Sequence, residues 1–292
     1  MCVGSNSSSP TMTRVIPSNC NNVGGVTSLR DDIFVMHHNN CRQQIEVYNA
    51  KTFILQRHIQ VYELGGSFGL AVCPHNNCLY ASNWNSNSVH RLELCDGNAV
   101  MKWSVARRPL GLSVNSEHSL LVVSYGERKL QIFTTVGTLL QDIPLQADIE
   151  YPSHAVQLPT GQFLVSHAGS LHRICLVGVD GAVVRSYGGR LGSQLTQMNE
   201  PRGLAVDREG RILVADHNNN RLLVIDQSLS SAHEMSVCVD RGLKGPHSLW
   251  YDQSRRRLYI GECSRGRVIV IDNLEDFTTK VVTASHEQQR SR

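Results

Sequence analysis

Two histidines, His154 and His247, lie where a zinc site is conceivable. His247 belongs to the string Gly245-Pro246-His247-Ser248-Leu249, and His154 ends the string Tyr151-Pro152-Ser153-His154. A catalytic zinc ion normally needs three protein ligands and an open position. The string Ser67-Phe68-Gly69, which occupies the equivalent position in an earlier repeat of the chain, contains no third histidine. The sequence therefore offers only a weak zinc site, and we expect no metal, no cofactor, and imidazoles that bond backbone groups.

A second set of residues combines cations with aromatic rings in predicted loops. Such residues suit single-stranded RNA, whose phosphates and unstacked bases they can hold. The formal net charge is only +3, which favours a protein or peptide ligand over RNA; an ordinary solvated surface is the remaining alternative. The candidate binding residues are Trp84, Arg107, Arg108, Tyr125, Arg128, Arg202, His217, Arg241, Lys244 and Arg265.

Other catalytic patterns are missing from the chain. The sequence has no P-loop and no G-x-G-x-x-G string, so these nucleotide-binding enzyme classes are not indicated. Its nine cysteines are scattered without a C-x-x-C pair, which excludes a zinc-binding RING or B-box module. We expect a non-enzymatic, reduced, cytoplasmic protein. The alternative is a secreted form with one or two bridges, such as Cys73–Cys78 or Cys20–Cys41.

The segment Asn199–Asp226 shows which elements must position these residues. It contains three short apolar runs, Gly203–Val206, Ile212–Ala215 and Leu222–Ile225. Polar turn sequences separate the runs, and Gly210 can adopt the positive φ of a tight reversal. Short, continuous and β-branched runs are typical of strands that are covered on both faces.

The same pattern recurs along the chain and predicts the architecture. The position of Gly203 is occupied elsewhere by Gly25, Gly69, Gly111, His154 and Ser248, at successive spacings of 44, 42, 43, 49 and 45 residues (69−25, 111−69, 154−111, 203−154, 248−203). Each of these anchor positions is followed by a second and a third apolar run, with room for a more polar fourth strand. This period predicts an all-β, six-bladed β-propeller with four antiparallel strands in each blade.

The repeats divide the chain into one domain and two short tails. We expect a tail at 1–11, a propeller over 12–284 and a second tail at 285–292. The ring can be closed by Met12–Ile16 or by Phe277–Val282, and we slightly favour the N-terminal strand because it would join the first and last blades. No apolar run approaches the roughly 20 residues of a membrane span, so we expect no membrane partner and a monomer.

A polar pair recurs at the loop between the second and third strands. In the fifth repeat the pair is Asp216 with Arg221, and in the sixth it is Glu262 with Arg267. We expect salt bridges that fix these loops, each exposed and worth about 0–1 kcal/mol. The fourth repeat has His167 and His172 at the same spacing. A shared ligand-binding rim is the alternative interpretation.

The fifth repeat resembles an NHL repeat through its PxGLAVDxxGxxxVADxxNxRLxVID core. NHL repeats occur in tripartite-motif-type ubiquitin ligases, in related RNA-binding regulators and in peptide-amidating lyases. The resemblance implies a propeller that recognises protein or RNA, linked to ubiquitin-dependent or post-transcriptional regulation. The Pro-His string around His247 resembles the zinc-ligand motif of the amidating lyases. A zinc-dependent lyase using His154 and His247 is therefore the alternative function.

Overall fold

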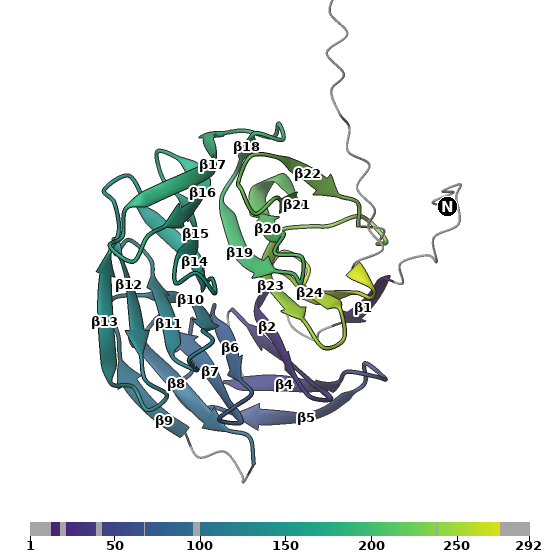
Figure 1. Ribbon diagram of the computed structural model, residues 1–292. Coiled ribbons are helices and arrows are strands. Elements are labelled where there is room, and N and C mark those ends of the chain that lie inside the picture. Colours follow the sequence, from purple (N-terminus) through teal and green to yellow (C-terminus); the bar gives the residue numbers. More distant parts are fainter. Residues whose placement is uncertain are drawn as a thin grey trace, which may run out of the picture.

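The strands of the computed structural model form six sheets arranged around a central axis (Figure 1). The structure describes residues 13–17, 22–38, 43–66, 68–95, 100–237 and 239–274. The first sheet, or blade, contains β2 (Val23–Leu29), β3 (Asp32–His37), β4 (Gln44–Asn49) and β5 (Leu55–Gln60). The second blade contains β6 (Leu70–Cys73), β7 (Cys78–Asn83), β8 (Ser88–Glu93) and β9 (Val100–Ser104). The third blade contains β10 (Pro109–Val114), β11 (Leu120–Ser124), β12 (Lys129–Phe133) and β13 (Leu139–Pro144).

The other three blades complete the ring in chain order. The fourth blade contains β14 (Tyr151–Gln157), β15 (Phe163–Ala168), β16 (His172–Val177), β17 (Val183–Leu191) and β18 (Gln197–Met198). The fifth blade contains β19 (Pro201–Val206), β20 (Ile212–Asp216), β21 (Arg221–Ile225) and β22 (Ala232–Met235). The sixth blade contains β23 (Pro246–Asp252), β24 (Arg257–Glu262), β25 (Arg267–Ile271) and β1 (Thr13–Pro17). A short 3₁₀ turn, η1 (His217–Asn219), joins β20 to β21. The predicted six-bladed, all-β propeller is confirmed.

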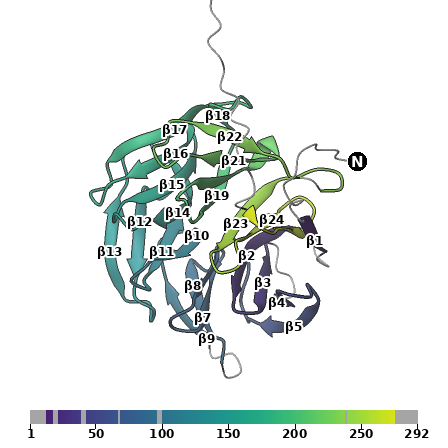
Figure 2. The same ribbon diagram turned by 45° about the vertical axis from the view of Figure 1, so that its right-hand side comes forward.

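The N-terminal strand closes the ring. β1 pairs antiparallel with β25, from Thr13 opposite Ile271 to Pro17 opposite Arg267, and both views place β1 beside the last blade (Figures 1 and 2). The favoured closure is therefore confirmed. The competing strand Phe277–Val282 and the predicted tails 1–11 and 285–292 lie outside the described residues.

The fourth blade departs from the predicted four strands. Its outer strand β17 pairs in parallel with the short β18, with Arg190 opposite Gln197. The cause is visible in the spacing, because His154 and Gly203 are 49 residues apart (203−154), which is longer than the other intervals. The extra residues form the β17–β18 connection.

The core lies between neighbouring blades. Every residue of β20 and of β21 is buried, as the continuous apolar runs predict for strands covered on both faces. Leu213 and Leu222 of the fifth blade belong to the same buried cluster as Leu249 and Ile260 of the sixth. Outer strands are different, since β13 exposes all but one of its side chains.

The anchor positions bring the inner strands together. A Cβ added at Gly111 would lie 2.5 Å from the carbonyl oxygen of Ser153 in the next blade, so only glycine permits this approach. Where the anchor is not glycine, its side chain bonds the next blade instead. The amide of Leu204 donates to His154 Nδ1 at 3.3 Å, and the amide of Val26 donates to Ser248 Oγ at 3.1 Å. Each of these anchor positions thus contacts the inner strand of a neighbouring blade at the channel.

The cysteines of the second blade lie side by side. Cys73 and Cys78 are opposite each other in β6 and β7, and both are buried free thiols. Burial raises the pKa of the Cys78 thiol. Cys20 and Cys41, the other pair considered for a bridge, lie outside the described residues.

Within the part of the chain that the structure describes, no helix is long and apolar enough to cross a membrane.

Candidate ligand-binding face

Nine of the ten predicted binding residues lie in loops or connections at one face of the propeller, and Arg202 lies at the adjoining end of β19. We call this face the loop face; it consists of the loops between the second and third strands of each blade and the connections between blades. Trp84 and Tyr125 lie in second-to-third-strand loops, whereas Arg108 and Lys244 lie in connections between blades. The turn with Arg255 and Arg256 joins β23 to β24 and lies on the opposite face.

Aromatic rings form a continuous chain across part of the loop face. The ring centroids of Phe68 and Trp84 are 5.3 Å apart, those of Trp84 and Tyr125 5.5 Å, and those of Tyr125 and Tyr151 5.1 Å. The guanidinium of Arg108 lies 5.3 Å from the Trp84 ring, within the range of a cation–π contact. We call Phe68, Trp84, Tyr125 and Tyr151 the aromatic arc. It spans the second, third and fourth blades and remains partly exposed, Tyr151 at 41%.

Phe68 links this arc to a group of histidines at the mouth of the channel. Its ring lies 3.7 Å from that of His38 and 5.7 Å from that of His247. His217 of η1 follows, 5.8 Å from His247. Rings of the first and sixth blades thus contact Phe68 of the second, and the fifth blade joins this group through His247.

The predicted cations fall into two groups. Arg107, Arg108 and Arg128 are exposed, and none makes an ion pair with another described residue. Lys244, in the connection between β22 and β23, is also exposed. The others are engaged: Arg202 Nη2 donates to Glu200 at 2.7 Å, Arg241 lies 3.6 Å from Asp240, and Arg265 Nη1 donates to the carbonyl of Gly242.

The loop face also carries acidic side chains. Its connections and loops contain Glu63, Glu127, Asp148, Glu150, Glu200 and Asp240, and Asp216 and Glu262 lie at the adjoining ends of β20 and β24. Carboxylates from several connections therefore reach the same face as the predicted cations. The unpaired positive charge is concentrated beside the aromatic arc.

The two predicted loop pairs are buried, not exposed. Arg221 Nε lies 2.7 Å from Asp216 Oδ2, with exposed side-chain fractions of 8% and 0%. Arg267 pairs with a fully buried Glu262. Each carboxylate also accepts a backbone amide from the preceding connection, from Asn199 in one case and Lys244 in the other.

These pairs therefore join each loop to the inter-blade connection beside it. The estimate for exposed pairs is wrong for them, because the connection covers both charges. The fourth blade differs again: Arg173 Nε donates to His167 Nε2 at 2.9 Å, and the Glu200 amide donates to His172 Nδ1 at 2.9 Å. The two histidines do not form the pair that their spacing suggested.

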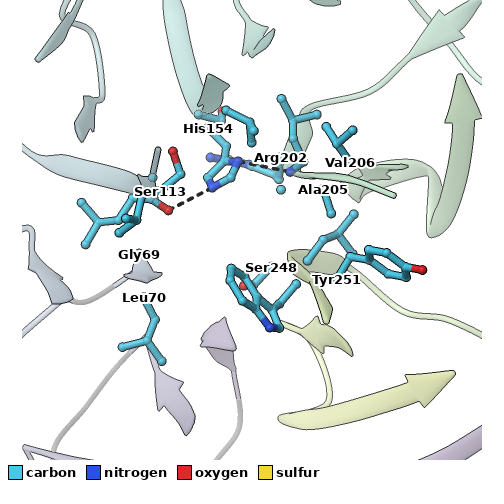
Figure 3. A pocket seen from close by; sticks show the side chains of 18 of the residues that line it. Gly69, Leu70, Ser113, His154, Arg202, Ala205, Val206, Ser248 and Tyr251 are labelled. Atoms are coloured by element: carbon cyan, nitrogen blue, oxygen red, sulfur yellow. Dashed lines mark hydrogen bonds between the residues drawn. The ribbon is translucent and has the colours of Figure 1, made fainter. Parts of the chain in front are cut away.

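The two candidate zinc ligands lie at the channel with their ring nitrogens engaged differently. His154 Nε2 donates to the Leu112 carbonyl at 3.2 Å while Nδ1 accepts from the Leu204 amide, as Figure 3 shows. His247 Nδ1 donates to the Gly24 carbonyl at 3.2 Å. Burial lowers the pKa of His154 to about 4 and that of His247 well below its ordinary value, so both are neutral at pH 7. No group of three metal-binding side chains occurs among the described residues.

Several residues of this face were not singled out from the sequence. Phe68, Tyr151 and His38 complete the aromatic contacts, whereas only Trp84 and Tyr125 were among the predicted binding residues. A signal was present, because Phe68 directly precedes the anchor Gly69 and Tyr151 lies three residues before the anchor His154. Residues just before an anchor enter the inner strand from the loop face and so surround the channel mouth.

The fold and the repeat define a class of protein. A family model of the NHL repeat matches residues 198–225, from β18 through β21. Together with the six blades, this match makes the chain an NHL-type β-propeller.

Comparison with individual proteins agrees with this class. Over 131 residues the chain is 27% identical to the protein brain tumor of Drosophila melanogaster. The match covers 43% of this chain and only 12% of that protein.

Solved structures share the fold. The virginiamycin B lyase of Staphylococcus aureus aligns with a TM-score of 0.65 at 9% identity, over 90% of this chain and 99% of its own. The hydrazine synthase of Kuenenia stuttgartiensis aligns with a TM-score of 0.64 at 14% identity, over 89% and 97%. A protein of unknown function from Bacteroides thetaiotaomicron has a TM-score of 0.71 at 11% identity, over 90% and 76%. At these identities the likeness concerns the fold alone.

Proposed function

We propose that this propeller is a non-catalytic recognition module whose loop face binds single-stranded RNA. The observation that carries the proposal is the aromatic arc, with Arg108 stacked on Trp84 and the exposed Arg107 and Arg128 beside it. Unpaired bases stack on such rings in a sequence-tolerant way, while arginines hold the backbone phosphates. Net charge alone favoured a protein ligand, and the arc is the reason to place RNA first.

The chemistry of the channel histidines supports a binding role over the lyase alternative. Both ring nitrogens of His154 bond backbone groups, so a zinc ion would have to displace at least one of those bonds. His247 could offer only the nitrogen that does not bond Gly24. A catalytic zinc site requires about three protein ligands, which this pair does not supply.

A protein segment is the second candidate ligand. The acidic side chains of the loop face, Glu63, Glu127 and Glu150 among them, favour it because they weaken the attraction of the face for a polyanion. Peptide recognition would use the same rings with fewer charge contacts. In either case, a link to ubiquitin-dependent or post-transcriptional regulation would make the propeller the part that selects the target.

Salt dependence separates the two ligands. With three arginines on phosphates, the affinity for a labelled random 12-nucleotide RNA should fall about 20-fold between about 50 and 200 mM salt, since the slope for single strands is about −0.7 per phosphate. Fluorescence anisotropy measures this directly. A flat response, or no binding at 50 mM salt, would contradict the RNA proposal and leave a protein ligand.

A further inference from the structure

The central channel encloses a cavity of about 380 Å³. It is lined by residues of the inner strands, including Leu70, Leu112, Leu204 and Leu249 from four different blades. Figure 3 shows side chains from several strands pointing into it. Small-molecule sites in proteins have volumes of roughly 300–1,000 Å³, so the space is large enough to be one.

The cavity is covered at the loop face and accessible from the other side. Phe68, whose ring packs against His38 and His247, borders its loop-face end. At the far end the lining includes Pro159 and Gln253, which are exposed residues just beyond the inner strands β14 and β23. A ligand would therefore enter opposite the aromatic arc, independently of anything bound there.

The lining is electrically balanced. Its arginine, Arg202, is paired with Glu200, and its carboxylate, Asp207, accepts from Arg211 Nε at 2.6 Å. His154 uses both ring nitrogens on backbone groups. A charged ligand would have to leave water without a free opposite charge in this lining, which is costly.

One ring nitrogen of the lining is available to a ligand as an acceptor, in addition to the buried Nε of Arg202, which has no hydrogen-bond partner among the described residues. His247 donates from Nδ1 to Gly24, so its neutral ring carries an acceptor lone pair on Nε2. The remaining wall is mainly aliphatic, with Trp250 and Tyr251 contributing aromatic surface. This chemistry suits an apolar ring system with a single N–H or O–H donor.

We propose that the channel binds a neutral, mostly apolar ring compound that carries one hydrogen-bond donor. Since an apolar cavity of about 150 Å³ holds benzene, this cavity should hold roughly 15 non-hydrogen atoms. The site shares only Phe68 with the aromatic arc. A small molecule bound here would contact the inner strands of several blades at once and stabilise the ring.

Two dyes with one scaffold test the proposal. N-phenyl-1-naphthylamine is neutral, has an N–H donor and fluoresces in apolar surroundings; 8-anilinonaphthalene-1-sulfonate adds an anionic group to the same skeleton. We expect the neutral dye to bind with one saturable equivalent and the sulfonate at least about 10-fold more weakly, because of the desolvation of its charge. Equal binding of both dyes, or no saturable binding of the neutral one, would overturn the proposal.

Matched variants locate the bound dye. Val206→Trp places an indole in the lining and should weaken dye binding at least 10-fold, whereas Val179→Trp, at a valine that is 64% exposed, should leave it unchanged. Val114→Trp, in the lining of another blade, replaces Val206→Trp if circular dichroism shows that the latter does not fold. Dye binding that survives a folded lining variant but is lost in Trp84→Ala would move the site to the loop face and refute the proposal.

Discussion

Asp216→Ala is expected to lower the free energy of unfolding by about 3–5 kcal/mol, the cost of removing one partner of a buried ion pair. Without Asp216, Arg221 keeps the carbonyls of Ser193, Gln194 and Gln197, but its charge loses the carboxylate at 2.7 Å. The Asn199 amide loses its acceptor as well. Urea denaturation followed by circular dichroism measures the change.

Glu234→Ala is the matched control for this substitution. Glu234 lies 3.7 Å from the same Arg221, but 55% of its side chain is exposed, so its loss should cost about 0.5 kcal/mol or less. Glu262→Ala should behave like Asp216→Ala, because Glu262 is equally buried. A loss below about 1 kcal/mol for both buried carboxylates would show that these pairs are not structural.

The loop pairs illustrate what sequence reasoning could and could not supply. The spacing of Asp216 and Arg221 placed them opposite each other across a hairpin, because register in a short hairpin follows directly from the turn. Their burial depends on the β17–β18 connection, which reaches Arg221 from about 25 residues earlier in the chain. The sequence of the fifth repeat contains no signal that predicts the burial of this pair by the β17–β18 connection.

The predicted fold rests on a stronger signal than the predicted site. Six recurrences of an anchor and three apolar runs define the blades, and each glycine anchor reflects a contact that admits no side chain. The aromatic arc has no such repetition. Trp84 lies in a second-to-third-strand loop, whereas Phe68 and Tyr151 lie just before the anchors of two other inner strands, so only the closed ring shows that they are neighbours.

Trp84→Ala is expected to weaken RNA binding about 5- to 150-fold, since stacking of one base on an aromatic ring contributes about 1–3 kcal/mol. Trp84 is the centre of the arc: Phe68, Tyr125 and Arg108 all contact its ring. Trp84→Phe keeps an aromatic face and should restore most of the affinity. Anisotropy titrations at one salt concentration measure all three proteins.

Charge reversal beside the arc provides an independent measurement. Arg107→Glu and Arg108→Glu together should lower the affinity further and reduce the salt slope by about one for each phosphate contact that is lost. Arg202 is unsuitable for this purpose, because a glutamate there would face Glu200 and disturb the fold. Arg208→Glu, at an exposed position of the turn between β19 and β20 on the opposite face, makes the same kind of charge change away from the loop face. An equal loss of affinity in that control would contradict a local site.

Photo-crosslinking of a 4-thiouridine-containing RNA, followed by mass spectrometry of the linked peptides, tests the central claim most directly. The account predicts crosslinks to peptides that contain Trp84, Tyr125 or Tyr151, on the loop face beside Arg107 and Arg108. Crosslinks concentrated at the Arg255–Arg257 turn, on the opposite face, would contradict it.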